Sequence, residues 1–526
     1  MPGADTTASI GQSARVRLSE LLAALSFSSD FGLGQPMEHV LRACMIALRL
    51  AERLDLDERT RCETYWVTLL ATACTGESFE LAQVFGDDIA FRSGIFHVGP
   101  SQLAQMMYVL GRTGGDGPTR LRLAAGIVAS RGKAVEKTFL AHCAITREVS
   151  ARVGLDPAVG AALLHTFARW DGKGVPRGVG SEEVAMPARL MLLAEYVEVH
   201  HRLHGVDGAI QMVRAHAGKL LSPQVANVFC DGAMEILADL DDSIWERVID
   251  AEPLPRPPLS EEEFDIVLEV MADIADLKSP WFSGHSRGVA DLASSAARAA
   301  GMPARDVVTT RRAGLLHDLG RTAIANSIWD RREPLGEGDR ERIRLHAYYT
   351  ERMLRRPAAL GGLAAVASSD HERLDGSGYH RAARGSDIPL LGRYLAAADV
   401  YHALLEDRPH RPAWTPDEAA AHVRAEARAG RLDGAAVDVV LGVAGHKRTG
   451  ASSGPSGLTP REVEVLVLVA RGATTRQVAR ALGITPKTAG NHIERIYTKI
   501  GASSRSTATL FAMQHGLLAT LEPVGP

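Results

Sequence analysis

GLLHDLGR (Gly314 to Arg321) is the most informative stretch of the chain, because an apolar run leads directly into the pair His317-Asp318. Further histidines and acidic residues lie before and after this pair, at His285, His346, Asp370-His371-Glu372, Asp375 and Asp399. Imidazole nitrogens and carboxylate oxygens together suit Fe, Mn or Zn, and one carboxylate can bridge two ions. The pattern therefore predicts a paired metal site, which suits phosphodiester hydrolysis.

The segments around this stretch are helical in pattern. Ala-, Leu- and Arg-rich periodicity recurs, for example in LRACMIALRLAERL (41–54) and ADLASSAARAAGM (290–302), and β-branched alternation between turn residues is nearly absent. We therefore expect an all-α chain. With 526 residues, 46% of them hydrophobic and 23% charged, it has room for several domains.

Composition also limits the location and the partners. No apolar run reaches the ~18 residues of a membrane span, and the N-terminus lacks a secretory pattern, so we expect a cytoplasmic protein without a membrane partner. The five cysteines form no CxxC pair and are expected to be reduced thiols. The net charge is −4, yet residues 457–526 hold eight Lys or Arg against four Asp or Glu. A basic end on an acidic body indicates a polyanion partner for that end alone.

Two stretches read as linkers, one Pro-rich at 251–263 and one Gly/Ser-rich at 447–457. The first two pieces also align with each other. His39 lies 246 positions before His285, whereas His142 lies 204 positions before His346. Two constant offsets predict a duplication with 42 extra residues in the first copy, between Cys74 and His142. The expected order is a disordered terminus and a first copy, then a second copy, then a small C-terminal domain, at 1–14, 15–250, 264–446 and 458–520.

The second copy resembles the HD-GYP family of metal-dependent phosphodiesterases within the HD superfamily. The resemblance rests on GLLHDLGR, HAYYTERML (346–354), DHERLDGSGYH (370–380) and ADVYHALLEDRPHRPA (398–413). It implies two divalent metal ions, with Asp318 bridging a first ion on His285, His317 and Asp399 to a second on His346, Asp370 and His371. It also implies that Asp318 and Arg321 act in catalysis, and that a loop approaches substrate phosphate at Gly376, Gly378 and Tyr379.

The second copy departs from the family pattern at five places. Asp370-His371 replaces a pair of histidines, and Arg321 replaces a lysine. His380 and His402 replace a proline and an aspartate in the region where substrate is expected. Trp281 stands where some members place a glutamate for a third metal, so we expect two metals at most. The identity of the metal and of the nucleotide stays open.

The first copy has lost the predicted chemistry. The offsets map His317-Asp318 onto Ala71-Thr72 and Asp370-His371-Glu372 onto Thr166-Phe167-Ala168. What survives cannot hold a metal pair, because the bridging carboxylate is missing. We interpret this copy as a degenerate HD-type domain that serves packing, dimerisation or ligand sensing.

The C-terminal piece reads as four short helices. Thr459 and Thr474 begin capping boxes, and Thr485-Pro486 gives an N-cap followed by proline at the first helical position. In the third helix Ala489, Ile493, Ile496 and Ile500 face the core, opposite a polar and cationic face. Such a face fits a DNA major groove, with donors for bases and cations for phosphates. We expect DNA contacts from Thr474, Lys487, Thr488, Asn491, His492, Arg495 and Lys499.

This piece closely resembles the helix-turn-helix DNA-binding domain of LuxR-type regulators over 458–518. The resemblance implies double-stranded DNA as a partner and a homodimer that pairs through the last helix, 504–515. Gly490 departs from the usual lysine and costs helix stability. The whole chain is therefore predicted to be a LuxR-type transcriptional regulator whose HD-GYP-like domain binds a metal pair and senses or hydrolyses a phosphorylated nucleotide, of which a cyclic dinucleotide is one kind. An active phosphodiesterase with a DNA-binding tail, or a non-catalytic oligomerisation scaffold, are the alternatives.

Overall fold

Every regular element in the described part of the chain is a helix, which confirms the predicted all-α fold. The computed structural model describes residues 16–98, 108, 133–240, 243–446, 455–502, 504–515 and 517–518. The predicted disordered terminus lies outside these residues, as do residues 99–107 and 109–132 within the stretch from Cys74 to His142 where 42 extra residues are predicted, and most of the linker at 447–457. Among the described residues, no helix combines the length and apolar character that crossing a bilayer requires.

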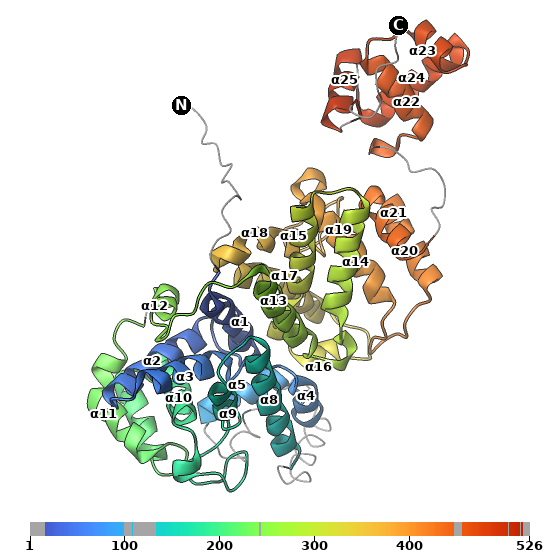
Figure 1. Ribbon diagram of the computed structural model, residues 1–526. Coiled ribbons are helices and arrows are strands. Elements are labelled where there is room, and N and C mark those ends of the chain that lie inside the picture. The colour runs from blue at the N-terminus through green and yellow to red at the C-terminus, as the bar shows by residue number, and fades with distance from the viewer. Residues whose placement is uncertain are drawn as a thin grey trace. The chain divides into compact units, whose positions relative to one another are not determined.

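The chain divides into two compact units, residues 1–432 and 433–526, so both predicted copies lie largely in the first unit. The first copy surrounds a core in which α2 and α3 pack on the long α10 (Figure 1). Its helices are α1 (Leu18–Gly32), α2 (His39–Arg53), α3 (Glu58–Leu70), α4 (Ser78–Phe85), α5 (Asp88–Val98), α8 (Lys133–Arg152), α9 (Pro157–Leu163), α10 (Met186–His216), α11 (Pro223–Ile236) and α12 (Ile244–Asp250).

The second copy is centred on α14, which packs on α15 and α19. A short 3-10 helix, η3 (Leu319–Ala323), follows α15 and packs on α17. The helices are α13 (Glu261–Asp276), α14 (His285–Ala299), α15 (Ala304–Leu316), α16 (Asn326–Trp329), α17 (Glu337–Arg355), α18 (Ala358–Ala367), α19 (Leu390–Leu404) and α20 (Pro416–Arg428).

The two copies are built alike at the helix that begins with a histidine. His39 is the first residue of α2, and His285 is the first residue of α14. In each copy a buried aspartate of the preceding helix, Asp30 or Asp276, accepts the N–H of the second helical residue at 2.9 Å. The offset of 246 residues relates the aspartates as it relates the histidines. Each aspartate thus caps the helix and fixes where the helix begins, and with it the position of the histidine.

A buried ion pair joins the two copies. Nζ of Lys278, just after α13, lies 2.6 Å from Oδ2 of Asp88 at the start of α5, and both side chains are fully buried. The other carboxylate oxygen of Asp88 accepts the backbone N–H of Asn326 at 2.9 Å. The hydroxyl of Ser28 in α1 donates to Thr322 in η3 at 2.9 Å. The first copy therefore packs directly against the element that follows His317-Asp318.

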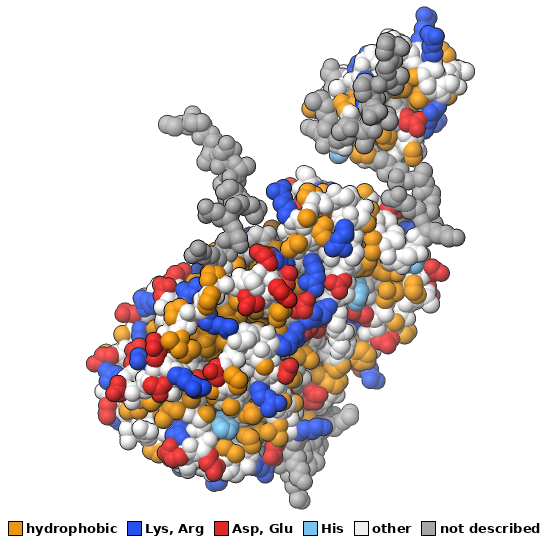
Figure 2. All heavy atoms as spheres, viewed as in Figure 1, with side chains coloured by type: hydrophobic (Ala, Val, Ile, Leu, Met, Phe, Trp, Pro, Cys, Tyr) orange, Lys and Arg blue, Asp and Glu red, His pale blue; other side chains and the backbone are white. Residues whose placement is uncertain are grey.

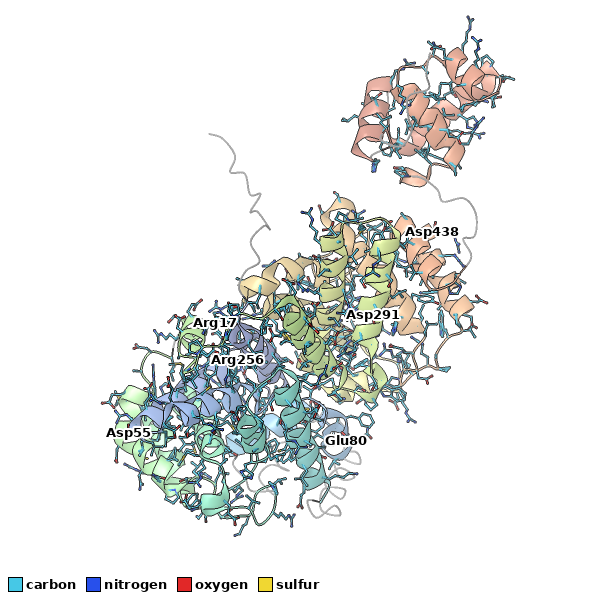
Figure 3. All side chains as sticks on the ribbon, in the orientation of Figure 1. Arg17, Asp55, Glu80, Arg256, Asp291 and Asp438 are labelled. Carbon is cyan, nitrogen blue, oxygen red and sulfur yellow. The ribbon has the colours of Figure 1, made fainter. Side chains whose placement is uncertain are left out.

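The surface of this unit is held by mixed-charge contacts. Arg17 donates to Glu252 at 2.7 Å, and the backbone N–H of Arg256 donates to the same carboxylate (Figure 3). Glu269 binds both Arg287 and Arg311. Acidic and basic side chains are accordingly intermixed on the face of the larger unit drawn in Figure 2. Surface charge there is largely neutralised within the protein.

The second unit holds α21 (Gly434–Val443) and a four-helix group, α22 (Pro460–Ala470), α23 (Thr475–Ala481), α24 (Pro486–Ile500) and α25 (Arg505–Gln514). Both predicted capping boxes are present: Thr459 with Glu462, and Thr474 with Gln477. Thr485 caps α24 through the N–H of Thr488. Ala489 and Ile496 are buried in the core of this group, as the sequence pattern predicts.

Replacing Lys278 with methionine tests the junction between the copies. Lys278→Met leaves the carboxylate of Asp88 buried without its cation, which costs about 3–5 kcal/mol of unfolding free energy. Urea unfolding followed by circular dichroism measures this loss. Arg59→Met, which removes a partly exposed pair with Glu63, should cost less than about 1 kcal/mol. Equal losses in the two variants would contradict a special role for the buried pair.

Candidate metal centre and nucleic-acid interface

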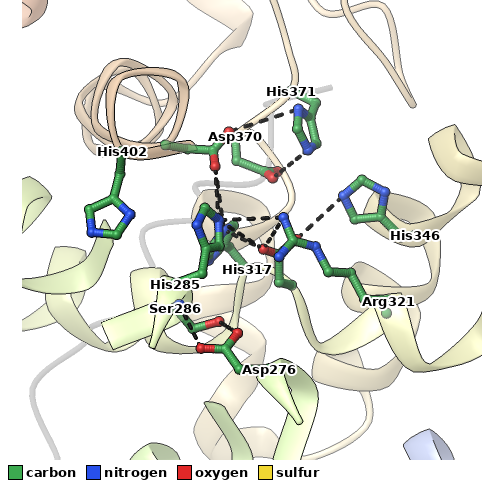
Figure 4. A network of polar contacts seen from close by, with 12 residues as sticks. Asp276, His285, Ser286, His317, Arg321, His346, Asp370, His371 and His402 are labelled. Carbon is green, nitrogen blue, oxygen red and sulfur yellow. Dashed lines mark hydrogen bonds and ion pairs between the residues drawn. The ribbon is translucent and has the colours of Figure 1, made fainter. Parts of the chain in front are cut away.

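The seven predicted ligand residues come from five segments and meet in the interior of the second copy. His285 begins α14 and His317-Asp318 follows α15. His346 lies in α17, Asp370-His371 follow α18, and Asp399 lies in α19. All are buried except His371, which is partly exposed. Residues 114 positions apart in the sequence are thus brought to one point (Figure 4).

The seven residues form two adjacent groups. His285, His317 and Asp399 make one group, whose ligand atoms all lie within 4.8 Å of one another. Asp318 with His346, Asp370 and His371 makes the other. Asp318 faces both: Oδ2 lies 2.8 Å from Nε2 of His317, and Oδ1 lies 3.5 Å from Nε2 of His346. This is the arrangement in which one carboxylate can bridge two positions.

Backbone contacts turn the histidine rings toward this centre. Nδ1 of His317 lies 2.7 Å from the carbonyl oxygen of Gly314, and Nδ1 of His346 lies 2.5 Å from that of Ile343. A ring that donates from Nδ1 presents Nε2 as the acceptor or ligand atom. Both Nε2 atoms, and both carboxylate oxygens of Asp370, are buried and lack a hydrogen bond of good geometry within the described residues. Buried polar atoms without a hydrogen-bond partner are rare in proteins, and a metal ion bound between these atoms would satisfy them.

The pKa values show where positive charge is missing. Burial disfavours the charge on Asp318, but Arg321 and His317 hold its pKa well below the usual range. Burial raises the pKa of Asp370 well above the usual range, against the attraction of His317. Burial also lowers the pKa of His346 to about 4. With a pKa of about 4, His346 is uncharged near neutral pH, and the uncharged imidazole is the form that binds a metal. The charged form of Asp370 is disfavoured until a cation lies beside it.

Arg321 lies beside the bridging carboxylate. Its Nη2 is 2.6 Å from Oδ2 of Asp318, and its guanidinium carbon is 4.3 Å from the ring centre of Phe282. Nε and Nη1 of Arg321 are buried and make no hydrogen bond within the described residues. A guanidinium with unused donors beside the predicted ligands can bind a phosphate oxygen.

The predicted phosphate loop lies at the edge of the centre. A side chain on Gly378 would come within 2.4 Å of the backbone nitrogen of Arg373, so only glycine fits there. Tyr379 stacks on His371 with ring centres 4.8 Å apart. The buried Glu372 accepts two backbone N–H groups of the returning chain, at 2.8 and 2.9 Å. Gly376 adopts a φ of +80° in the same loop. The loop is therefore a fixed wall beside the second group.

In the first copy arginine and histidine side chains lie beside the buried carboxylates. His39 contacts Glu198 through Nδ1 and Glu195 through Nε2, and Arg42 binds Glu198 at 2.7 Å. The buried Glu77 binds His142 at 2.8 Å and Arg92 at 2.5 Å. Cys74 joins Glu77 and His142 in a group that has metal-ligand atoms, but the arginine already neutralises the carboxylate.

The predicted DNA-contacting residues lie mainly on one exposed face of the four-helix group. Lys487, Thr488, Asn491 and Arg495 are exposed on α24, and Thr474 is exposed at the start of α23. Two residues differ from the rest of the set. His492 is partly buried, with no hydrogen bond to its buried Nδ1 among the described residues. Lys499 donates to Glu462 at 2.7 Å.

Some residues of the centre carry no signal in the sequence pattern. Glu406 contacts Nδ1 of His285, and Asp276 caps α14. The hydroxyl of Thr350 binds the N–H of Gly320 and the carbonyl of His317, joining η3 to α17. Gly320, two residues after Asp318, is a sequence signal for the close approach of η3 to α17. A side chain there would lie 2.0 Å from the carbonyl oxygen of His346.

The chain is similar to known proteins in both of its recognised parts. Residues 269–436 match the HD domain family, and residues 456–512 match the bacterial regulatory proteins of the luxR family. Both resemblances predicted from the sequence are thereby confirmed.

Among full-length relatives, 3'3'-cGAMP-specific phosphodiesterase 3 of Vibrio cholerae is 28% identical over 412 residues, which cover 77% of this chain and 90% of the relative. The cyclic di-GMP phosphodiesterase response regulator RpfG of Xanthomonas campestris is 30% identical and covers 42% of this chain and 60% of its own length. The crystal structure of the V. cholerae cyclic GMP-AMP phosphodiesterase V-cGAP3 superposes with a TM-score of 0.57 at 24% identity, over 82% of this chain and 99% of that one. An alignment of 412 residues is longer than either copy, so the relative shares parts of both.

The pH dependence of stability tests the charge replacement in the first copy. Burial disfavours the charge on His39, but Glu198 and Glu195 raise its pKa to about 10 from an ordinary 6.5. The stabilisation is therefore fully present below pH 6.5 and is lost as the pH rises toward 10. In metal-free protein, the unfolding free energy of wild type minus that of His39→Gln should shrink between pH 6.5 and 9.5. A constant difference would mean that His39 is uncharged throughout.

Proposed function

We propose, from the premise that this chain joins an HD domain to a LuxR-type DNA-binding domain, that it is a DNA-binding transcriptional regulator whose HD domain binds two divalent metal ions and senses or hydrolyses a phosphorylated cyclic dinucleotide. The proposal rests chiefly on one observation. Two ligand groups share Asp318 between them, and buried oxygen and nitrogen atoms of both lack hydrogen bonds within the described residues. Mixed nitrogen and oxygen donors suit Fe, Mn or Zn.

Different residues of the second copy would hold the metal ions, bind phosphate and contact the nucleotide in the proposed site. His285, His317 and Asp399 would hold one ion, and His346, Asp370 and His371 the other, with Asp318 between them. When bound, such ions lower the pKa of water and neutralise charge on an attacked phosphate. Arg321, whose Nε and Nη1 make no hydrogen bond within the described residues, would bind a phosphate oxygen. The Gly376 to Tyr379 loop forms the adjoining wall for the nucleotide.

The relatives support a cyclic dinucleotide as the ligand, since their names specify 3'3'-cGAMP or cyclic di-GMP. The region where substrate is expected differs from the family pattern at His380 and His402. His380 is partly buried and binds Glu351 of α17 at 2.6 Å. Cyclic dinucleotides as a class are therefore proposed, rather than one of them. A working phosphodiesterase with a DNA-binding tail is the second candidate, which the retained pair His317-Asp318 favours.

The DNA partner is proposed from the exposed face of α24. Lys487, Asn491 and Arg495 are exposed along one side of this helix, opposite the buried Ala489 and Ile496. Donors and cations on one helical face suit base edges and phosphates in a major groove. The proposed homodimer would pair through α25, where Leu510 is 53% exposed.

Replacing the bridging aspartate tests the HD site. Wild-type protein purified without chelator should carry about two metal ions, measured by mass spectrometry, and should bind or cleave 3'3'-cGAMP or cyclic di-GMP. Asp318→Ala should lose at least one ion and any cleavage, because both ligand groups lose their shared carboxylate. Thr72→Ala, at the equivalent position of the first copy, is the matched control and should behave as wild type.

The outcomes separate the candidate functions. Metal with cleavage that Asp318→Ala abolishes would make the HD domain an enzyme. Metal and nucleotide binding without cleavage would make it a sensor. Wild-type protein that holds no metal after purification and metal supplementation would contradict the proposal and leave a helical scaffold attached to a DNA-binding domain.

Arginine and lysine on α24 should differ in their effect on DNA binding. Arg495 is exposed, so Arg495→Ala should weaken binding to every DNA sequence and reduce the salt dependence by about one ion. Lys499 is held by Glu462 and by the carbonyl of Gly457, so Lys499→Ala should weaken binding less. Fluorescence anisotropy at several salt concentrations measures both. Equal losses would show that the Glu462 contact opens when DNA binds.

A further inference from the structure

His285 differs from the other candidate ligand histidines in what binds the far side of its ring. His317 and His346 use backbone carbonyl oxygens for Nδ1. Nδ1 of His285 instead lies 3.1 and 3.0 Å from the two carboxylate oxygens of Glu406. Glu406 follows α19 and has no part in the ligand pattern predicted from the sequence. A charged acceptor thus stands behind this one ligand.

The carboxylate of Glu406 is held in place by an arginine. Nη2 of Arg408 donates to Oε2 of Glu406 at 2.6 Å, and Nη1 donates to the carbonyl oxygen of Trp281 at 2.9 Å. Trp281 belongs to the turn that precedes α14 and His285. Oε1 of Glu406 also lies 3.1 Å from Nδ1 of His402. Arg408 therefore ties Glu406 to the backbone from which His285 projects.

The turn that carries Glu406 is itself fixed to the end of α19. The side chain of Arg411 donates to the carbonyl oxygens of Ala403 and Leu404, at 2.6 and 3.2 Å. Arg408 and Arg411 pair through two backbone hydrogen bonds of 2.9 and 3.1 Å. Because the last carbonyls of α19 are satisfied in this way, the direction in which Glu406 leaves the helix is set.

We infer that Glu406 is a positioning residue for the first metal, an inference that rests on the proposed metal pair. By accepting Nδ1–H of His285, it keeps Nε2 turned toward Asp318 and Asp399, which lie 3.3 and 3.2 Å away. A carboxylate behind a ligand imidazole fixes the ring and makes the ligand nitrogen more basic. Loss of such a partner weakens metal binding about 10- to 100-fold.

The first copy contains the same contact from a different position. Glu198 binds Nδ1 of His39 and is held by Arg42 at 2.7 Å. The offset of 204 residues aligns Glu198 with His402, not with Glu406. A carboxylate paired with arginine thus stands behind the first histidine of both copies, although the two carboxylates are not equivalent in sequence. The first copy keeps this contact although it lacks the candidate metal ligands, so the contact also serves packing. A metal-binding measurement is therefore needed to show that Glu406 positions His285 for a metal in the second copy.

Cobalt titration of metal-free, full-length protein tests the inference. Visible absorption of Co²⁺ reports ions bound to nitrogen and oxygen ligands, so the two affinities can be followed without catalysis. Wild type should bind two ions. Glu406→Ala should lower one affinity about 10- to 100-fold and leave the other unchanged. Glu406→Gln should lose less, because its amide oxygen still accepts Nδ1–H.

A matched control and the melting temperature separate the possible outcomes. Glu269→Gln removes another partly buried, arginine-paired carboxylate that touches none of the ligands, and it should bind Co²⁺ as wild type does. If Glu406→Ala melts at the wild-type temperature and binds both Co²⁺ ions with wild-type affinity, the inference is overturned, while the proposed metal pair still stands. Should Glu406→Ala unfold, Glu406→Leu, which keeps a similar volume but offers no acceptor to Nδ1–H, decides in its place: unchanged affinities overturn the inference, and one weakened affinity supports it. Wild type that binds no Co²⁺ would refute the proposed function, and the inference with it.

Discussion

Buried carboxylates need positive charge beside them, and both helical copies of this chain are organised around that need. An ionised carboxylate taken out of water costs several kcal/mol unless a cation compensates it. In the first copy the chain supplies the cations itself, with Arg42 at Glu198 and Arg92 at Glu77. In the second copy Arg321 pairs with Asp318, but burial still raises the pKa of Asp370 well above its usual range despite the nearby His317 and Arg321. The difference between a degenerate copy and a candidate metal centre is thus a difference in where the cations come from.

The degenerate copy nevertheless supports the centre mechanically. Its α1 packs on η3 and α17, the elements that follow Asp318 and carry His346. The buried pair Lys278–Asp88 fixes the segment between α13 and α14 to α5 of the first copy. The first copy is thus in direct packing contact with the elements around Asp318 and His346. The similarity to the V. cholerae phosphodiesterase also extends over a length that exceeds one copy.

The sequence singled out candidate ligands that the structure brings together, and local patterns mark several of them: His317-Asp318 ends an apolar run, and Asp370-His371 precedes a glycine loop. Helix caps such as Thr459 and Thr474 were equally readable, since capping depends on residues three apart. Contacts between distant segments left no such trace. Glu406 follows a helix with no periodic signal, and its distance to His285 depends on how α14 and α19 pack. Lys499 fits the cationic stripe of α24, but the tertiary fold turns it onto Glu462.

The exchange of a histidine for Asp370 changes the charge of the centre as well as its donor atoms. In the proposed site three carboxylates, Asp318, Asp370 and Asp399, would face two dications, so the ions would be more fully neutralised than with two carboxylates and an extra imidazole. Oxygen donors favour harder ions, which would move the preference from Zn toward Mn or Fe. Burial raises the pKa of Asp370 well above its usual range, so its charged form is disfavoured until a cation lies beside it. Arg321 and His317 hold the pKa of Asp318 well below its usual range, so the two carboxylates of the second group differ in how strongly the protein alone favours their charged forms.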